Sequence, residues 1–225
     1  MPERIVLFGG TFNPIHHGHL IAARAVAEYF HFPRITFVPA AVPPHKHFEG
    51  ASDDGSAGAD RSPVLPSAEE RHEMVRLAIR GEPLFDVSDV ELNRRPPSYT
   101  FDTLMAMRTE HGLEAQLHWV VGADMLADLP TWRRADEVVD MATIITAARP
   151  PWSERLDRTL VKLRERFTAD QAARLAAAIA PTPLVDISST QLRHRVRDGK
   201  SVKFLTPDSV IAYIVQKGLY RQGGP

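Results

Sequence analysis

Two glycines and three histidines near the N-terminus have the types and spacing needed to bind phosphate groups. Gly9 and Gly10 end an apolar run, and glycines there let the backbone turn tightly and bring its N–H groups close to a ligand. His16 and His19 are three residues apart, so both side chains can face one space if a helix begins near residue 18. The free N–H groups and the dipole of a helix N-terminus favour anions. The stretch GGTFNPIHHGHL (9–20) therefore predicts a polyphosphate site.

The same histidines leave two other interpretations open. His16, His17 and His19 could bind zinc or another transition metal, but that needs a third or fourth ligand in a closed geometry. The sequence has no HExxH pattern and no cysteine to complete such a site, so we predict no metal held by the protein itself. The histidines could instead satisfy the hydrogen bonds of a turn, and this stretch alone does not decide between a turn and a phosphate site.

A second candidate phosphate site is the run Ile187-Ser188-Ser189-Thr190, followed by Arg193. An apolar run that ends in hydroxyl residues is typical of a strand leading into a helix. Backbone N–H groups, hydroxyls and the rigid fork of a guanidinium can together hold a phosphate there. The alternative is a simple helix cap formed by Ser189 or Thr190.

The apolar pattern of the chain predicts a scaffold for both sites. Short apolar runs indicate strands, and apolar spacings of three and four indicate helices between them. This alternation favours an α/β fold with a doubly wound parallel sheet, in which ligands bind beyond the carboxyl ends of the strands. The predicted strands cover residues 4–8, 35–38, 85–92, 117–121, 142–147 and 184–187, and predicted helices begin near Gly18, after Ser67, at Tyr99 and with Pro207 in the first helical position.

Two segments lie outside this alternation. Residues 49–66 are rich in Gly, Ser, Ala, Asp and Pro without periodicity, and we expect a mobile loop there. Residues 153–167 alternate charges at helical spacing, which is typical of a solvated helix face. The length of 225 residues suits a single domain, in which residues 188–225 would form a small helical portion.

Composition limits the classes of partner. The formal net charge is −1, so no overall basic field favours nucleic acid or an anionic membrane. Hydrophobic residues make up 44% of the chain, but no apolar run approaches the ~20 residues of a membrane helix. The absence of cysteine and of a signal-peptide pattern predicts a cytoplasmic protein. Whether it forms a homo-oligomer is left open by the sequence.

Several motifs together resemble one protein family over nearly the whole chain. The run His16-His17-Gly18-His19 matches the H/T-x-G-H motif of a nucleotidyltransferase superfamily that includes class I aminoacyl-tRNA synthetases and phosphopantetheine adenylyltransferase. Within it, the sequence is similar to the bacterial nicotinate-nucleotide adenylyltransferases. The supporting motifs follow in the family's order: PPHK at 43–46, SYTFDT at 98–103, GAD at 122–124, LPTW at 129–132, ISSTQLR at 187–193, YI at 213–214 and GLY at 218–220.

This resemblance implies a Rossmann-like nucleotidyltransferase fold and adenylyl transfer from ATP, delivered with Mg²⁺, to nicotinate mononucleotide. The products would be nicotinate adenine dinucleotide and pyrophosphate, in NAD biosynthesis. The residues implied to stabilise the phosphates during transfer are His16, His19, Lys46 and Arg193. The residues implied to bind ATP are Gly9, Gly10, Thr11, Phe12, His16, His19, Ile187, Ser188, Ser189, Thr190 and Arg193.

The resemblance also implies a site for the pyridine nucleotide. Trp132 could stack on the cationic ring, Asp124 could accept ribose hydroxyl groups, and N–H groups near Thr100 could bind the carboxylate. Trp132 could equally be a core anchor, and Asp124 a helix cap. The full set of implied acceptor residues is His45, Lys46, Thr100, Gly122, Asp124 and Trp132, with Lys46 in a loop over the phosphates.

One position departs from the family pattern, because Asn13 stands where the family often has aspartate. The amide brings no charge, which weakens any metal-binding role for residue 13. Two other functions stay open: a phosphopantetheine or other nucleotidyltransferase of the same fold, and a non-catalytic nucleotide-binding module. The choice between nicotinate and nicotinamide nucleotides and the order of substrate binding depend on geometry that the sequence does not fix.

Overall fold

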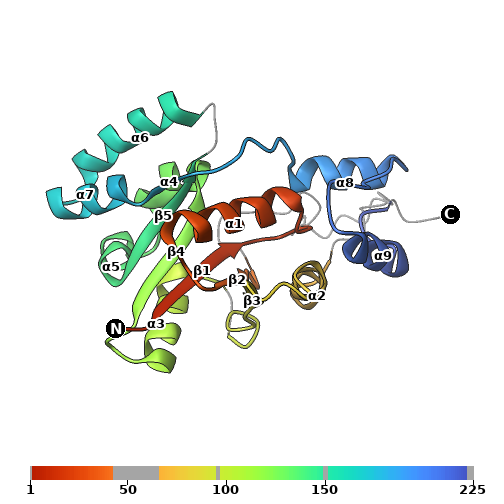
Figure 1. The fold of residues 1–225 in the computed structure, drawn as a ribbon, viewed down its shortest axis with the longest axis horizontal. Coiled ribbons are helices and arrows are strands. Elements are labelled where there is room, and N and C mark those ends of the chain that lie inside the picture. Colours follow the sequence, from red (N-terminus) through yellow and green to blue (C-terminus); the bar gives the residue numbers. More distant parts are fainter. Residues whose placement is uncertain (1, 43–65, 95–96, 149–151, 222–225) are drawn as a thin grey trace, which may run out of the picture.

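The computed structural model describes residues 2–42, 66–94, 97–148 and 152–221 (Figure 1). Two predicted site residues, His45 and Lys46, lie outside these ranges. Of the loop predicted at 49–66, only Pro66 falls within the described part.

A single six-stranded sheet forms the centre of the described structure, with every strand parallel to its neighbours. The order β3-β2-β1-β4-β5-β6 confirms the predicted doubly wound fold, since the chain proceeds outward from β1 on one side and from β4 on the other. The strands are β1 (Arg4–Gly10), β2 (Ile35–Pro39), β3 (Phe85–Val87), β4 (Gln116–Gly122), β5 (Ala142–Ala148) and β6 (Ile179–Pro181).

Helices cover both faces of the sheet (Figure 1). The apolar side chains of α1, α2 and α9 pack on one face, and those of α3 to α7 pack on the other. Successive strand residues alternate between these two cores, as Val6 and Leu7 do, because strand side chains point to opposite faces in turn. The helices are α1 (His17–Phe30), α2 (Ala68–Ala78), α3 (Thr100–His111), α4 (Ala123–Asp128), α5 (Ala135–Met141), α6 (Trp152–Arg166), α7 (Ala169–Ala177), α8 (Ser189–Arg197) and α9 (Asp208–Lys217).

Three predicted boundaries are wrong. The sixth strand is Ile179–Pro181 and not 184–187, because residues 179–181 pair with the end of β5 while Leu184 is 61% exposed. The third strand ends at Val87, since the chain turns where Leu92 N–H donates to the carbonyl of Asp89. Pro207 is the residue before the last helix and not its first residue.

Gly9 and Gly10 do not turn the chain as predicted, because both belong to the extended strand β1. The left-handed conformation occurs at Phe12, with a φ of 47°. The glycines are needed for close approach instead. A Cβ added to Gly9 would lie 2.1 Å from Cζ2 of Trp119, and one added to Gly10 would lie 2.7 Å from Cζ of Phe12.

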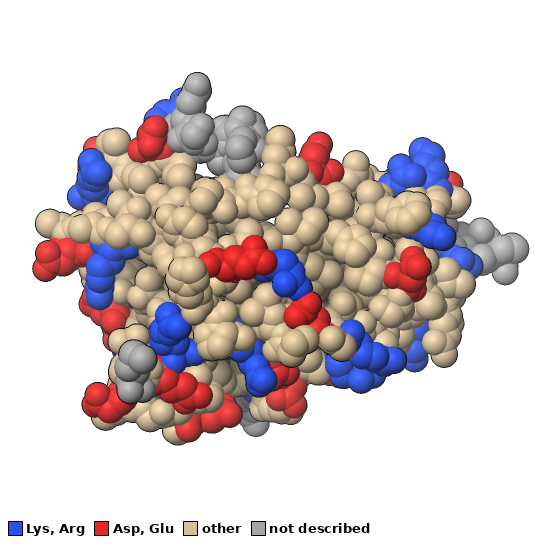
Figure 2. Space-filling model, viewed as in Figure 1, with Lys and Arg blue, Asp and Glu red and all other residues tan. Residues whose placement is uncertain are grey.

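No helix in the described ranges is both long enough and apolar enough to cross a membrane. Acidic and basic side chains are interspersed over the face shown in Figure 2, in keeping with the net charge of −1. An anionic substrate must therefore be held by local groups and not by an overall field.

Replacement of Gly9 by alanine is expected to lower the free energy of unfolding by about 1–3 kcal/mol, the usual cost of overpacking. Trp119 is only 4% exposed and cannot move freely away from the added methyl group. Urea denaturation of G9A, W119F and the double variant measures the effect. We expect the double variant to lose less stability than the sum of the single variants. Additive losses would contradict the proposed contact.

Candidate active site

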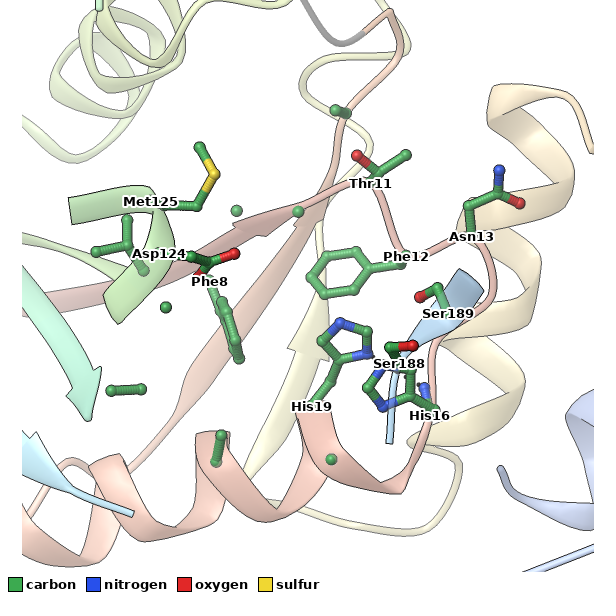
Figure 3. A pocket seen from close by; sticks show the side chains of 18 of the residues that line it. Phe8, Thr11, Phe12, Asn13, His16, His19, Asp124, Met125, Ser188 and Ser189 are labelled. Atoms are coloured by element: carbon green, nitrogen blue, oxygen red, sulfur yellow. Dashed lines mark hydrogen bonds between the residues drawn. The ribbon is translucent and has the colours of Figure 1, made fainter. Parts of the chain in front are cut away.

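A cavity of about 910 Å³ opens at the carboxyl ends of β1, β2, β4 and β5 (Figure 3). The strand order reverses between β1 and β4, and a crevice forms there because successive connections leave in opposite directions. Every predicted site residue in the described part of the chain lines this cavity: Gly9, Gly10, Thr11, Phe12, His16, His19, Thr100, Gly122, Asp124, Trp132, Ile187, Ser188, Ser189, Thr190 and Arg193.

The loop from β1 to α1 is held by hydrogen bonds to its carbonyl groups. A carbonyl oxygen pointing at a phosphate would repel it, so engaging these oxygens elsewhere favours anion binding. The acceptor and donor pairs are the carbonyl of Gly10 with Ala40 N (2.9 Å), Thr11 with Arg71 Nη1 (2.8 Å), Asn13 with Arg193 Nη1 (2.9 Å), Pro14 with Ser189 Oγ (2.8 Å) and Ile15 with Thr206 Oγ1 (2.8 Å).

Arg71 on α2 is a charged donor that is almost fully buried, with 2% exposure. Its Nη1 donates to Thr11 and its Nη2 donates to the carbonyl of Ala41 at 2.9 Å. Burial lowers the pKa of its guanidinium, although an arginine remains protonated at neutral pH. Arg71 thus fixes the end of β1 against the end of β2.

Asn13 is held by a buried tyrosine. The Tyr220 hydroxyl donates to Oδ1 of Asn13 at 2.6 Å, and the exposed fractions of the two residues are only 1% and 3%. Burial raises the pKa of Tyr220, so it stays a neutral donor. At this position the amide acts as an acceptor that supports the loop.

His16 and His19 stack on each other, with ring centroids 3.7 Å apart (Figure 3). The backbone N–H of His16 donates to Nδ1 of His19 at 3.2 Å. Since Nδ1 accepts this bond, a neutral His19 carries its proton on Nε2. The ring of Phe12 meets the His19 ring edge to face, with the two ring centroids 5.1 Å apart. This contact also restricts the orientation of His19. In its neutral form His19 therefore has Nε2–H as its ring donor.

The hydroxyl groups at the start of α8 have partners within the protein. Ser188 is the N-cap, and its Oγ accepts from Gln191 N at 3.2 Å, so neither Ser189 nor Thr190 forms the cap. Ser189 donates to the loop carbonyl of Pro14, and Thr190 Oγ1 accepts from Arg193 Nη2 at 3.1 Å. Arg193 lines the cavity and also holds the loop.

Residues near the start of α3 and α4 line the other end of the cavity. Thr100 is the first residue of α3, and Tyr99 before it provides no side-chain cap for the helix N–H groups. Asp124 lies in the first turn of α4 and is exposed. The Asp124 carboxylate lies close to Gly122, where a Cβ would be only 2.5 Å from Asp124 Oδ1. A glycine at position 122 therefore leaves room for this carboxylate. Trp132 packs against the core and also lines the cavity.

Several lining residues were not singled out from the sequence. Arg133 lies over the Tyr99 ring, with Cζ 4.8 Å from its centroid, and pairs with Asp102 at 3.3 Å. Arg197 lies one helical turn beyond Arg193, and this spacing of four was a signal that could have found it. Within the described ranges, no group of three His, Cys, Asp or Glu side chains could hold a metal ion.

An open parallel sheet with a cavity at its switch point is the architecture of nucleotide-binding α/β proteins. Residues 7–195 match the sequence model of the cytidylyltransferase-like family. A protein of Thermomicrobium roseum named probable nicotinate-nucleotide adenylyltransferase is 37% identical over 97% of this chain and 92% of its own length. A protein of the same name from Serratia proteamaculans is 38% identical over 96% and 94%.

The fold has solved counterparts. A Plasmodium falciparum nicotinic acid mononucleotide adenylyltransferase complexed with NaAD superimposes with a TM-score of 0.71, at 17% identity over 98% of each chain. The chain belongs to the nicotinate-nucleotide adenylyltransferase family of cytidylyltransferase-like proteins.

Replacement of Tyr220 by phenylalanine is expected to lower the free energy of unfolding by about 1–3 kcal/mol, because Asn13 Oδ1 would stay buried without a donor. Urea denaturation is the measurement. Y213F is the matched control, because Tyr213 is only partly buried where it packs against the same core. Equal losses in both variants would show that the bond to Asn13 does not stabilise the fold.

Proposed function

We propose that this protein transfers the adenylyl group of ATP to nicotinate mononucleotide, forming nicotinate adenine dinucleotide and pyrophosphate. The observation that carries the proposal is the single cavity lined by both the HHGH loop and the ISST helix start on one side and by the SYT, GAD and LPTW motifs on the other. The relatives at 37% and 38% identity bear the corresponding name.

In the proposed reaction, an oxygen of the acceptor's 5′-phosphate attacks the α-phosphorus of ATP. The new P–O bond forms as the bond from the α-phosphorus to the bridging oxygen breaks, and pyrophosphate leaves. Such a transfer requires positioning and charge stabilisation and no protein nucleophile.

The ATP end of the site would be built from the β1–α1 loop and α8. His19 would donate through Nε2 to a phosphate oxygen, as its Nδ1 is engaged by His16. The N–H groups at the start of α8 favour the same anion. The remaining proposed ATP contacts are Gly9, Gly10, Thr11, Phe12, Ile187, Ser188, Ser189, Thr190 and Arg193, and Lys46 is proposed to stabilise the phosphates from outside the described ranges.

The acceptor end would be built from the starts of α3 and α4 and from Trp132. The uncapped N–H groups near Thr100 suit the carboxylate of the pyridine ring, and the Trp132 ring suits its cationic face. Asp124 is exposed at the cavity wall and could accept from ribose hydroxyl groups. Gly122 and His45 complete the proposed acceptor residues.

Mg²⁺ is proposed to enter with ATP. This metal binds one or two carboxylates together with phosphate oxygens, and Asp124 and Asp128 offer carboxylates at the cavity wall. The donor set fits a metal held mainly by the nucleotide, and when bound it would neutralise charge on the phosphates.

Pyrophosphate release by the purified protein with Mg-ATP tests the reaction. Nicotinate mononucleotide, nicotinamide mononucleotide and 4′-phosphopantetheine would be offered in parallel, and we expect the highest kcat/KM with the nicotinate nucleotide. Turnover with 4′-phosphopantetheine instead would reassign the acceptor end, and no release with any acceptor would reject the proposed reaction.

Replacement of His19 by alanine is expected to lower kcat by roughly 10²–10³, the usual cost of losing one preorganised donor. Steady-state pyrophosphate release measures it. H17A is the matched control, because His17 is the neighbouring imidazole and does not line the cavity. We expect H17A to keep turnover within about twofold of the wild type. Wild-type turnover in H19A would remove His19 from the mechanism.

A further inference from the structure

A buried polar network forms part of the wall at the acceptor end of the cavity. It consists of Glu91, Arg94, Ser98 and Thr103, which come from the turn after β3, the segment before α3 and the first turn of α3. Glu91 is 4% exposed, Ser98 8% and Thr103 not at all. Polar groups buried to this extent are retained where hydrogen bonds hold separate segments in one arrangement.

Thr103 connects Glu91 to the start of α3. Its hydroxyl donates to Oε1 of Glu91 at 2.6 Å and accepts from Nη2 of Arg94 at 3.0 Å. The same oxygen lies 3.3 Å from the carbonyl of Tyr99, the residue that precedes the helix. A shift of Glu91 would therefore displace the first turn of α3.

Ser98 connects the same carboxylate to the segment that follows β2. Its Oγ accepts from the N–H groups of Ala41 and Val42 at 3.1 and 3.2 Å, and its own N–H donates to the carbonyl of Val42 at 3.0 Å. With the acceptor capacity of Oγ used, the Ser98 hydroxyl proton is left for donation. Burial raises the pKa of Glu91, and hydrogen bonds from Thr103 and Ser98 act in the opposite direction.

A buried charged pair is by itself weak evidence for a role in fold stability. The charged pair of Glu91 and Arg94 is 4.0 Å apart, and Oε2 of Glu91 has no hydrogen-bond partner among the described residues. A buried carboxylate with one such oxygen costs more than a well-packed apolar side chain would. What the network fixes is the cavity wall, since Ala40, Tyr99 and Thr100 all line the cavity.

We propose that Glu91 is a positioning residue for the acceptor nucleotide, which acts by holding the start of α3 against the end of β2. The proposal rests on the proposed function, because it assigns Tyr99 and Thr100 to the acceptor end. The ATP end is supported separately: Thr206, Ser189 and Arg193 hold residues 13–15 through bonds in which Glu91 takes no part.

The test is the effect of E91Q on the KM values of the two substrates in the pyrophosphate-release assay. The glutamine side chain keeps nearly the same volume but is neutral, so it accepts the hydrogen bonds from Thr103 and Ser98 more weakly than the carboxylate does. We expect KM for nicotinate mononucleotide to rise about tenfold or more, since small misplacements at a binding site have effects up to ~10²-fold. KM for ATP should stay within about twofold of the wild-type value.

A second pair of variants keeps the test independent of the folding of E91Q. T103V removes the hydroxyl, so it should also raise KM for nicotinate mononucleotide and leave KM for ATP unchanged. T103S keeps the hydroxyl and should show the wild-type KM for both substrates. E73Q is the control, because Glu73 is paired with Arg76 on α2 away from the cavity and should leave both KM values unchanged.

The outcomes separate the two proposals. A wild-type protein inactive toward every acceptor would refute the proposed function. In an active wild type, unchanged KM values in E91Q and T103V would overturn the role of Glu91. Equal rises in both KM values, or a fall in kcat alone, would show that Glu91 is merely structural. Either result would also overturn its proposed role in positioning the acceptor nucleotide.

Discussion

The geometry of the site depends on how the carbonyl groups of the β1–α1 loop are engaged. Five carbonyls between Gly10 and Ile15 accept hydrogen bonds from donors elsewhere in the protein, so an approaching phosphate does not face their oxygens. The donors on α8 and at Thr206 come from the last quarter of the sequence. The N-terminal motif thus acquires its shape only when the C-terminal helices are in place.

This dependence explains why residues near α8 serve two purposes. Arg193 and Ser189 lie at a cavity where an anion is favoured, yet both also donate to the loop. An arginine has five N–H donors, so two bonds to protein groups leave others for a ligand. The helix N-terminus and the loop therefore form one rigid surface, and a preorganised surface loses little free energy in reorganising around a charged transition state.

The cavity is supported by two separate sets of buried polar groups. Tyr220 and Thr206 hold the loop from the side of α9, while Glu91 and Ser98 hold the start of α3 from the side of β3. The sheet between them is closely packed, as the contact of Gly9 with the Trp119 ring shows. Two substrates can thus be held at a fixed separation, which is the main requirement of a direct group transfer.

The sequence by itself determined the alternation of strands and helices and the motifs that line the cavity, because periodicity and motifs such as HHGH and ISST are local signals. It misplaced the sixth strand because pairing with β5, and not the apolar run around Leu184, decides which residues extend the sheet. Only the tertiary structure revealed Arg71, Thr206 and Tyr220, whose partners lie 60, 191 and 207 residues away. A single polar residue carries no local pattern that indicates such a distant partner, so folding alone decides these contacts.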